Sequence, residues 1–600
     1  MENRRTDQSF CPPPSKRAEG PRRRQDDFAG VSLVELLRFR AAVQPLAMAY
    51  TFLREGEQES DCLTYEVLDR RSRAIAVELQ SQCRPGDRAL LLYQPGLEFI
   101  SAFFGCLYAG VVAVPAYPPS LTRSDRALLR LRAIVADAHP AVILSTEELG
   151  SNLARAVADS RDLGSSTTTG AIDGMVGRNW MATDTVADDN AALWRDPGAG
   201  SDTLAFLQYT SGSTATPKGV MITHGNLLHN LTYAFHLGDG DSSSPSVSWL
   251  PVIHDMGLIE GVLQPAFSGC PAYLMSPAAF LQRPIRWLNA IARYAATRSG
   301  GPNFAYDLCV RRIGPHDRAA LDLSTWRSAY CGAEPIRQDT LRAFTSAFAV
   351  AGFNPSSVRP CYGLAEATLL VTAGRWMDAE SDQTRVGCGG AQFDTRVLVV
   401  EPEHGRPCGP GTVGEIWVSG PGVARGYWNR PEETARTFRA RTDRGEGPFL
   451  RTGDLGYLHS GELYVTGRLK DVLIVRGMKH YPQDLEQTAE QHPVIRPGCT
   501  AAFATENGPL GDRIAIVAEA DIRQLKPPDT AESTILAIRR SVAELHGVLL
   551  DAVMLVAPGS IPKTTSGKLQ RFACRDAYLS DSLLALAIWR EPTREGERCA

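Results

Sequence analysis

Short apolar runs alternate with amphipathic stretches through the first two-thirds of the chain. Residues 89–93, 141–144 and 204–208 are apolar runs of strand length, which predicts buried strands. Between them, residues 126–138 place apolar side chains at helical spacing. This alternation predicts an α/β fold whose sheets are mostly parallel.

One uncharged stretch, from Phe99 to Thr122, is long enough to raise the question of a membrane span. Glycines and prolines interrupt it. We predict instead a buried helix over 98–109, a stop at Gly110 and a strand over 111–114. Those elements form half of a βαβ unit. The sequence therefore predicts no membrane span.

The pattern changes further along the chain. Residues 150–202 are rich in Ser, Thr, Asp and Gly, which predicts a surface connection. Short strands at 396–400 and 415–418, separated by Gly and Pro, predict a small β-rich subdomain. After Gly467 and Arg468, a new strand at 472–475 and a helix from Pro482 predict the start of a second domain.

These patterns lead to predicted limits for the parts of the chain. We predict a disordered tail over 1–28 and a large N-terminal domain over 29–467. The large domain would contain two α/β subdomains and the β-rich subdomain. A small, mobile α+β domain would follow over 468–580, and a C-terminal tail over 581–600.

Composition narrows the class of protein. The 600 residues are 44% hydrophobic and 22% charged, which is typical of a globular protein. A formal net charge of -4 gives no electrostatic support for binding nucleic acid or an anionic membrane. The 13 cysteines form no C-x-x-C pair, and the first 28 residues hold no apolar core of a signal peptide. We therefore expect reduced thiols and a cytoplasmic protein.

A loop rich in hydroxyl groups follows the apolar run at 204–208. It reads Tyr209-Thr-Ser-Gly-Ser-Thr-Ala-Thr-Pro-Lys-Gly219. Backbone N–H groups and hydroxyls in such a loop can surround phosphate oxygens, and the lysine adds a positive charge. A solvated loop without function is the alternative interpretation. The candidate phosphate-binding residues are Thr210, Ser211, Gly212, Ser213, Thr214 and Lys218.

Two other nucleotide-binding motifs are excluded. A P-loop has a second glycine before its lysine and leads into a helix, whereas Pro217 stands at that position and has no N–H to donate. Gly409-Pro-Gly411-Thr-Val-Gly414 matches the dinucleotide fingerprint in its letters, but it precedes an apparent strand instead of a helix. We interpret its glycines as turn residues.

Four further segments complete a pattern with the hydroxyl-rich loop. They are Tyr362-Gly-Leu-Ala-Glu366, Thr452-Gly-Asp454, Gly467-Arg-Leu-Lys-Asp471 and Pro562-Lys-Thr-Thr-Ser-Gly-Lys568. In this order they resemble the motifs of the adenylate-forming enzymes, which include acyl-CoA synthetases, nonribosomal-peptide adenylation domains and luciferases. Within that superfamily the chain looks most like the fatty acyl-AMP ligases. The stretches that carry this likeness are Leu250–Gly257, Pro302–Asp307, Gly332–Pro335 and Tyr481–Asp484, and the resemblance extends from about residue 30 to residue 580.

The resemblance implies a site for ATP. Tyr362 would stack on the adenine, with Gly363 beside it. The backbone of Gly332, Ala333 and Glu334 would line the other side of the base. These roles come from the family, since a tyrosine at the end of an apolar run has no nucleotide signal of its own.

The resemblance also implies sites for Mg²⁺ and for the ribose. Glu366 would help to hold Mg²⁺ as a hard oxygen ligand, although an acid also favours a helix start for its own sake. Asp454 would accept hydrogen bonds from the ribose hydroxyls, with Arg468 nearby. Taken alone, Thr-Gly-Asp is only a turn.

Two lysines have family-derived roles in the small domain. Lys568 would be catalytic, because a mobile ammonium can bridge the carboxylate and the α-phosphate as negative charge builds in the transition state. Without the motif around it, such a lysine is ordinarily a solvated side chain. Lys470 would be the hinge about which the small domain rotates between two half-reactions.

The acyl site is the least specific part of the pattern. His254, next to Asp255, could contact the carboxylate of the acyl substrate. A long, apolar channel for the alkyl chain would be lined by Met256, Gly257, Leu258 and Phe304. Met and Phe at such positions are also common in an ordinary core.

Several positions depart from the family pattern. They are Ala215, Ile253, Cys331 and Ala365, of which the last is common in fatty acyl-AMP ligases. The larger departure is a short segment over 374–385, where those ligases carry an insertion that disfavours transfer to coenzyme A. Transfer to coenzyme A therefore stays open.

The resemblance implies a ligase that activates a fatty acid with ATP and Mg²⁺ to acyl-AMP. The acyl group would then pass to the phosphopantetheine thiol of a separate acyl carrier protein, in polyketide or lipopeptide biosynthesis. A fatty acyl-CoA synthetase is the alternative, and Asp255 keeps amino-acid activation open. A non-catalytic binder with the same fold would be expected to lack Lys568 or Glu366, and both are present.

Overall fold

The computed structural model describes most of the chain, in two compact units. The described residues are 28–118, 125–162, 179–210, 217–237, 244–378, 385–476, 478–508, 511–521, 523, 530–563, 567 and 569–591. The first unit comprises residues 1–412, 416–452 and 458–464, and the second comprises residues 413–415, 453–457 and 465–600. The domain limits at 467 and 468 stay a prediction.

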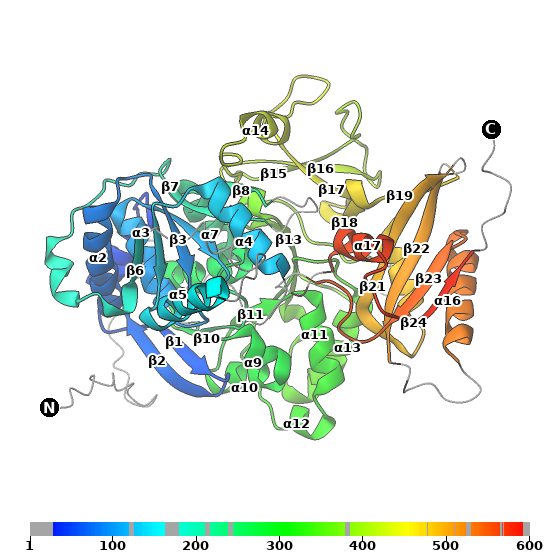
Figure 1. Ribbon diagram of the computed structural model, residues 1–600, viewed down its shortest axis with the longest axis horizontal. Coiled ribbons are helices and arrows are strands. Elements are labelled where there is room, and N and C mark those ends of the chain that lie inside the picture. Colours follow the sequence, from blue (N-terminus) through cyan, green and yellow to red (C-terminus); the bar gives the residue numbers. More distant parts are fainter. Residues whose placement is uncertain are drawn as a thin grey trace. The chain divides into compact units, whose positions relative to one another are not determined.

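A six-stranded sheet of the first unit has the order β6-β5-β3-β4-β7-β8 (Figure 1). Its strands are β3 (Arg88–Leu92), β4 (Val112–Ala116), β5 (Val142–Ser145), β6 (Asn179–Ala182), β7 (Leu204–Tyr209) and β8 (Gly219–Thr223). All neighbours pair in parallel except the hairpin β7–β8. The helices are α2 (Tyr65–Gln82), α3 (Glu98–Ala109), α4 (Asp125–Ala138) and α5 (Glu147–Asp162). The predicted α/β alternation is thereby confirmed.

Local sequence explains several boundaries in this sheet. Helix α3 begins at Glu98 as predicted and ends at Gly110, whose φ of 70° is one that glycine adopts without strain. Helix α2 begins after Thr64, whose hydroxyl accepts a hydrogen bond from the Val67 N–H. The strand predicted over 111–114 lies at Val112–Ala116. In the described part of the chain, every helix is too short or too polar to cross a bilayer.

An eight-stranded sheet of the first unit has the order β14-β13-β12-β11-β9-β10-β1-β2. Its strands are β1 (Met48–Arg54), β2 (Gln58–Thr64), β9 (Ser246–Ser248), β10 (Ala272–Met275), β11 (Arg298–Gly301), β12 (Ser328–Cys331), β13 (Val358–Gly363) and β14 (Leu370–Ala373). The helices are α1 (Leu33–Val43), α7 (His224–Leu237), α8 (Gln264–Ser268), α9 (Pro277–Gln282), α10 (Ile285–Arg293), α11 (Asn303–Arg312), α12 (Pro315–Ala319) and α13 (Gln338–Phe348). An aromatic core that includes Trp287, Tyr306, Trp326 and Phe344 packs α10, α11 and α13 together.

A four-stranded sheet corresponds to the predicted β-rich subdomain. Its order is β15-β16-β17-β18, with β15 (Arg396–Val400), β16 (Gly414–Ser419), β17 (Leu450–His459), β18 (Glu462–Arg468) and helix α14 (Pro431–Phe438). Strand β16 begins at Gly414. The glycines at 409, 411 and 414 therefore lead into a strand, as predicted, and not into a helix.

The second unit contains a sheet in the order β20-β19-β22-β23-β24, with β21 paired to β22 (Figure 1). The strands are β19 (Leu473–Val475), β20 (Met478–His480), β21 (Ile495–Gly508), β22 (Gly511–Ala520), β23 (Ala552–Val556) and β24 (Ala585–Arg590). Helices α15 (Pro482–Glu490) and α16 (Ala531–His546) share one core with the sheet, and α17 (Arg571–Leu579) packs in another core. This is the predicted α+β composition.

The prediction that residues 150–202 are only a surface connection is wrong. In the segment 150–202, α5 continues to Asp162, and β6 and two 3₁₀ helices, η3 (Thr183–Thr185) and η4 (Asp188–Leu193), follow. Isolated apolar residues such as Leu153 and Met181 are buried, and their spacing in a polar background gave no clear signal.

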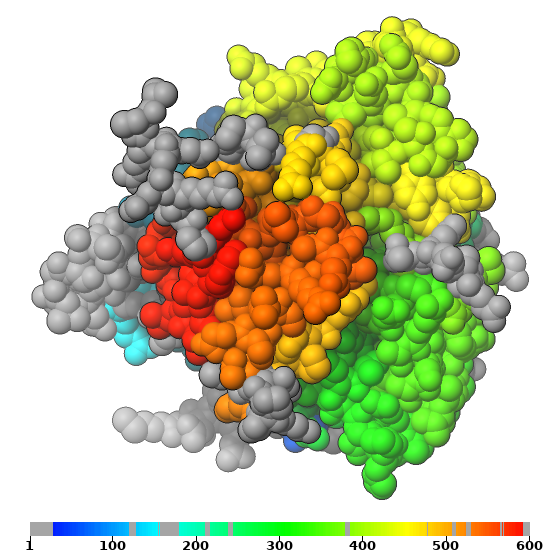
Figure 2. Space-filling view, turned by 90° about the vertical axis from the view of Figure 1, so that its right-hand side faces the viewer, coloured from blue at the N-terminus to red at the C-terminus, as the bar shows by residue number. Residues whose placement is uncertain are grey.

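The predicted C-terminal tail is also partly wrong. Residues 585–590 form β24, which pairs antiparallel with β23 (Figure 1). On the face of the second unit in Figure 2, the red C-terminal residues lie beside orange ones. The side chains of β24 alternate between two faces: Trp589 packs against the core, and Ile588, on the other face, is 41% exposed. Of the predicted N-terminal tail, residues 1–27 lie outside the described residues.

Candidate active site

The hydroxyl-rich loop is closed by a β-hairpin. Strands β7 and β8 pair from Leu204 with Thr223 to Tyr209 with Gly219. Next to the last pair, the Thr210 N–H donates a hydrogen bond of 3.2 Å to the Lys218 carbonyl. The two predicted phosphate-binding residues at its ends, Thr210 and Lys218, therefore lie directly opposite each other. The predicted residues Ser211, Gly212, Ser213 and Thr214 lie outside the described residues.

Lys218 and Glu366 meet on one tyrosine that the sequence analysis missed. The Lys218 ammonium lies 5.0 Å from the centre of the Tyr427 ring, and the Tyr427 hydroxyl donates a hydrogen bond of 2.8 Å to Glu366 Oε1. Burial and the Glu366 carboxylate raise the pKa of Tyr427, so its phenol keeps the proton that it donates. The cation predicted to bind phosphate and the acid predicted to bind Mg²⁺ are thus brought together.

Tyr427 reaches this position because its segment runs along the edge of β8. The Trp428 N–H donates to the Gly219 carbonyl at 2.7 Å, and the Met221 N–H donates to the Gly426 carbonyl at 2.9 Å. Glu366 lies on a 3₁₀ turn, η8 (Ala365–Ala367), which follows β13. Backbone pairing therefore fixes Tyr427 beside β8, and the Ala424 N–H, which donates to the Glu366 carbonyl at 2.9 Å, joins η8 to the same segment.

Lys218 also has a carboxylate partner that was not predicted. Its ammonium lies 3.2 Å from Glu433 Oε2, on the first turn of α14. The side chains of Lys218 and Glu433 are 23% and 30% exposed. A negative group therefore lies at the place where the sequence analysis expects phosphate.

The predicted adenine-binding residues follow two neighbouring parallel strands. Strand β12 leads into Gly332, Ala333 and Glu334, and β13 ends with Tyr362 and Gly363. A Cβ on Gly332 would lie 2.5 Å from Cys361 Sγ, and one on Gly363 would lie 1.7 Å from the Leu369 carbonyl oxygen. Only glycine fits these two close approaches. Because parallel strands end at one edge of a sheet, the two predicted groups lie next to each other.

The side chain of Glu334 connects this edge to the predicted acyl site. Its Oε1 accepts a hydrogen bond of 2.6 Å from the Phe304 N–H, in the first turn of α11. Phe304 packs against Trp249, with ring centres 6.0 Å apart. The loop after β12 and the start of α11 are thereby held together.

His254 precedes a π-helix, η5 (Met256–Leu263). His254 Nδ1 lies 2.6 Å from Asp255 Oδ1, and the Gln208 amide donates to the neighbouring Ile253 carbonyl at 3.1 Å. A Cβ on Gly257 would lie 2.0 Å from the Pro251 carbonyl oxygen, so this position requires glycine. The contact between Gln208 and Ile253 places His254 beside the C-terminal end of β7, where the hydroxyl-rich loop begins.

The other predicted acyl-site residues are closely packed. Met256 is 6% exposed and Leu258 is fully buried. Met256 belongs to the same hydrophobic core as Trp249, with Phe304 packed against it. The structure therefore shows them as core residues, and their role as lining of an acyl channel stays a prediction.

In the second unit, the predicted ribose-binding residues form an ion pair. The Arg468 guanidinium lies 2.9 Å from Asp454 Oδ1, and the Asp454 side chain is only 9% exposed. Lys470 is exposed on a 3₁₀ turn, η9 (Leu469–Asp471). Lys568 lies outside the described residues.

The ends of the Lys568 loop are fixed in the second unit. Lys563 and Leu569 form an isolated antiparallel bridge, and the Gln570 N–H donates to the Pro562 carbonyl at 3.0 Å. The next residue, Arg571, pairs with Glu486 at 2.6 Å and with Asp471 of η9 at 3.4 Å. Burial opposes its charge, but these carboxylates raise the pKa of Arg571 above its ordinary value. Sequence reasoning missed Arg571, because a lone arginine after a loop has no distinctive pattern.

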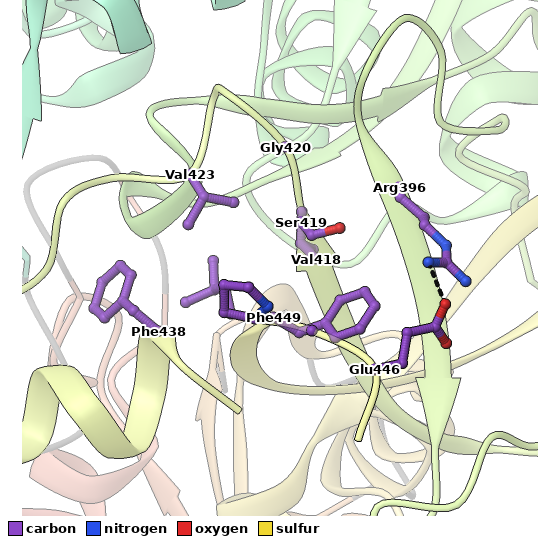
Figure 3. Close-up of a pocket in the computed structure, with 11 residues that line it drawn as sticks. Arg396, Val418, Ser419, Gly420, Val423, Phe438, Glu446 and Phe449 are labelled. Atoms are coloured by element: carbon purple, nitrogen blue, oxygen red, sulfur yellow. Dashed lines mark ion pairs between the residues drawn. The ribbon is translucent and has the colours of Figure 1, made fainter. Parts of the chain in front are cut away.

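A cavity of about 490 Å³ lies on the four-stranded sheet, beside α14 (Figure 3). Phe438 and the ion pair of Arg396 with Glu446, 2.6 Å long, lie at its two ends in this view. None of the predicted site residues that the structure describes lines it. The lining residues are Arg396, Val418, Ser419, Gly420, Val423, Phe438, Glu446, Gly447, Pro448, Phe449 and Leu450.

Comparisons with known proteins identify the family of this chain. Residues 37–428 match the family model of the AMP-binding enzymes, and residues 470–587 match that of the AMP domain of Disco-interacting protein 2-like proteins. The chain is 46% identical to the medium-chain-fatty-acid–[acyl-carrier-protein] ligase JamA of Moorena producens, over 92% of this chain and 96% of that protein. It is 36% identical to the long-chain-fatty-acid–AMP ligase FadD32 of Mycolicibacterium smegmatis, over 93% and 95%.

A solved structure shows the same relationship. The fatty acid AMP ligase from Legionella pneumophila superposes with a TM-score of 0.68 at 38% identity, over 93% of this chain and 98% of that chain. The predicted resemblance is therefore confirmed along nearly the whole sequence. This protein belongs to the AMP-binding, adenylate-forming enzymes, in their fatty acyl-AMP ligase branch.

Proposed function

We propose that this enzyme activates a fatty acid with ATP and loads it on an acyl carrier protein. In the first half-reaction, the carboxylate attacks the α-phosphate, which gives acyl-AMP and pyrophosphate. In the second, the phosphopantetheine thiol of the carrier attacks the acyl carbon and releases AMP. The supporting observation from the structure is that Lys218 and Glu366 converge on Tyr427. The identity to JamA, a fatty-acid–[acyl-carrier-protein] ligase, supports the substrate and the acceptor.

The residues of the first unit fit the phosphates and the metal that the reaction needs. Lys218 offers an ammonium group, and Glu366 offers carboxylate oxygens, which Mg²⁺ prefers. We assign Lys218 to the phosphates and Glu366 to Mg²⁺, which would neutralise phosphate charge when bound. Tyr362 and the backbone of residues 332–334 are assigned to the adenine, because they end neighbouring strands at one sheet edge.

The remaining roles rest on the family resemblance. His254 is assigned to the acyl carboxylate, since it lies beside the end of β7. Asp454 and Arg468 are assigned to the ribose, Lys568 to the transition state and Lys470 to the hinge. We also propose that the protein is cytoplasmic and acts in polyketide or lipopeptide biosynthesis.

Transfer to coenzyme A is the second candidate for the last step. The observation in its favour is the short segment over 374–385, where fatty acyl-AMP ligases carry an insertion. In the structure Trp376 is 5% exposed, and its indole N–H donates to Gln338 of α13 at 3.1 Å. Trp376 thus anchors the start of this segment on the first unit, whereas the next residue, Met377, is 79% exposed.

The test supplies the purified enzyme with ATP, Mg²⁺ and fatty acids of several chain lengths. We expect fatty-acid-dependent exchange of labelled pyrophosphate into ATP, and absence of exchange with every acid would refute the proposal. Coenzyme A or a pantetheinylated carrier protein is then added, and mass spectrometry identifies the acylated thiol. Efficient formation of acyl-CoA without loading of the carrier would overturn the proposed acceptor in favour of the second candidate.

A further inference from the structure

Glu433 occupies an unusual place for a carboxylate. It lies 3.2 Å from the ammonium of Lys218, the lysine assigned to the ATP phosphates. A carboxylate there adds negative charge next to a site that must receive a polyanion. An acid in the first turn of a helix is stabilised by the helix dipole, but this does not explain the position of Glu433. Glu432 has the same stabilisation in the same turn and remains exposed.

Helix α14 is fixed in a way that holds Glu433 against Lys218. The Thr434 hydroxyl accepts a hydrogen bond of 2.9 Å from the Tyr427 N–H, and the Phe438 ring lies 5.1 Å from the Tyr427 ring. Among the described residues, a second cation near Glu433 is Arg436, at 4.0 Å and 74% exposed, which makes it a weak competitor. Glu433 is therefore held by its helix and points to Lys218.

Lys218 has one partner that a ligand could replace and one that stays. The Tyr427 ring face, 5.0 Å from the ammonium, attracts a cation whether or not nucleotide is bound. The Glu433 carboxylate offers the same kind of charged oxygen that a phosphate offers, but with fewer charges. An ammonium has three donors and orients freely, so it can exchange one anion for another without moving its backbone.

We propose that Glu433 stands in for a nucleotide phosphate, and that ATP binding exchanges its carboxylate for phosphate at Lys218. The inference rests on the proposed function, in which Lys218 binds the phosphates. When no phosphate is bound, Glu433 holds the Lys218 ammonium beside the site. The exchange lowers the affinity for ATP, because the Lys218–Glu433 pair has to open.

The size of this effect follows from the exposure of the pair. Exposed ion pairs stabilise by amounts that correspond to roughly 1.5- to 5-fold in an equilibrium constant. Because the two side chains are about three-quarters buried, we expect the upper part of this range. Removing the Glu433 charge should therefore tighten ATP binding by about three- to fivefold.

The test compares Glu433→Gln with Glu432→Gln in the full-length enzyme. The Kd of ATP with Mg²⁺ is measured by calorimetry, and adenosine is the probe without phosphate. We expect Glu433→Gln to bind ATP about three- to fivefold more tightly, with the Kd of adenosine unchanged, and Glu432→Gln to match the wild type. Unchanged or weaker ATP binding by Glu433→Gln would overturn the inference, and so would an equal gain in Glu432→Gln.

A double-mutant cycle separates exchange at Lys218 from simple repulsion of phosphate. In a Lys218→Ala background no ammonium is left to release, so most of the gain from Glu433→Gln should disappear. A gain of equal size there would assign the effect to repulsion and refute the exchange. Glu433→Ala serves as a second variant if Glu433→Gln unfolds.

The failure of this inference is distinguishable from failure of the proposed function. A wild type without fatty-acid-dependent pyrophosphate exchange refutes the function. A wild type that exchanges pyrophosphate, combined with a variant that binds ATP no better, refutes only the role of Glu433.

Discussion

A buried ion pair connects the π-helix of the acyl site to the eight-stranded sheet. Glu260 lies in η5, and Arg298 begins β11, the strand that leads into Phe304. The two side chains form an ion pair and are 8% and 18% exposed, and Arg298 also donates to the Ala234 carbonyl at 3.2 Å. Burial opposes the charge of Arg298, but Glu260 raises the pKa of Arg298 above its ordinary value.

Replacing Arg298 with methionine should be strongly destabilising. Removal of one partner leaves a buried carboxylate without its cation, which typically costs about 3–5 kcal/mol. Because Arg298 is 18% exposed, water can partly solvate the remaining charge, so we expect about 3 kcal/mol. Replacing both residues, as Glu260→Leu with Arg298→Met, removes the unpaired charge and should cost only about 1 kcal/mol or less.

Urea unfolding of the full-length enzyme measures these free energies of unfolding. Arg311→Met is the control, because its pair with Asp307 is 39% and 26% exposed and should contribute less than about 1 kcal/mol. We also expect Arg298→Met to raise the KM for fatty acid more than the KM for ATP, since η5 carries Met256 and Leu258. A cost below about 1 kcal/mol for Arg298→Met, or a double variant as unstable as the sum of the single variants, would refute the reasoning.

Three further predictions concern separate parts of the molecule. Gly363→Ala brings a Cβ to 1.7 Å from the Leu369 carbonyl and should lower pyrophosphate exchange about a hundredfold, whereas Gly409→Ala, with open space around it, should not. Lys568→Ala should lower acyl-AMP formation by about 10²- to 10³-fold with an unchanged Tm, and unaltered pyrophosphate release would contradict its assignment. Burial lowers the pKa of His224 to about 4, so its neutral form stabilises the fold fully above the unfolded value of about 6.5. As pH falls from there to 4, about 3 kcal/mol should be lost, and His224→Gln should flatten that loss in urea unfolding.

The sequence predicts the frame of the phosphate loop because that frame is local. The apolar run at 204–208 and the Ser, Thr and Gly residues after it are sufficient to indicate a strand followed by a loop. Thr210 and Lys218 lie at the two ends of that loop. The same holds for helix α3, whose predicted bounds match those observed. The helix stops at Gly110 because that one residue adopts a positive φ, which glycine does without strain.

What the sequence does not predict depends on contacts between distant segments. Strand β24 needs β23 beside it before Trp589 can be buried, and the polar background around Met181 hides the edge strand β6. Arg571 is recognisable only once Glu486 and Asp471 lie within reach of it. In each case the stabilising partner is far along the chain, so no local spacing indicates it.

Tyr427 shows why such a residue escapes a motif search although it joins two motifs. Its segment carries no alternation that predicts a strand, yet its backbone extends β8 through hydrogen bonds from Trp428 to Gly219 and from Met221 to Gly426. That pairing alone carries the tyrosine to Lys218, two residues before Val220, with which Tyr427 forms a bridge. Its hydroxyl then donates a hydrogen bond to Glu366, on the turn that follows β13 of the eight-stranded sheet. Main-chain pairing at a sheet edge therefore positions Tyr427, and its side chain joins the two charged groups. Tyr427→Phe keeps the backbone and the ring beside Lys218, so it should remove the contact with Glu366 without dismantling the fold.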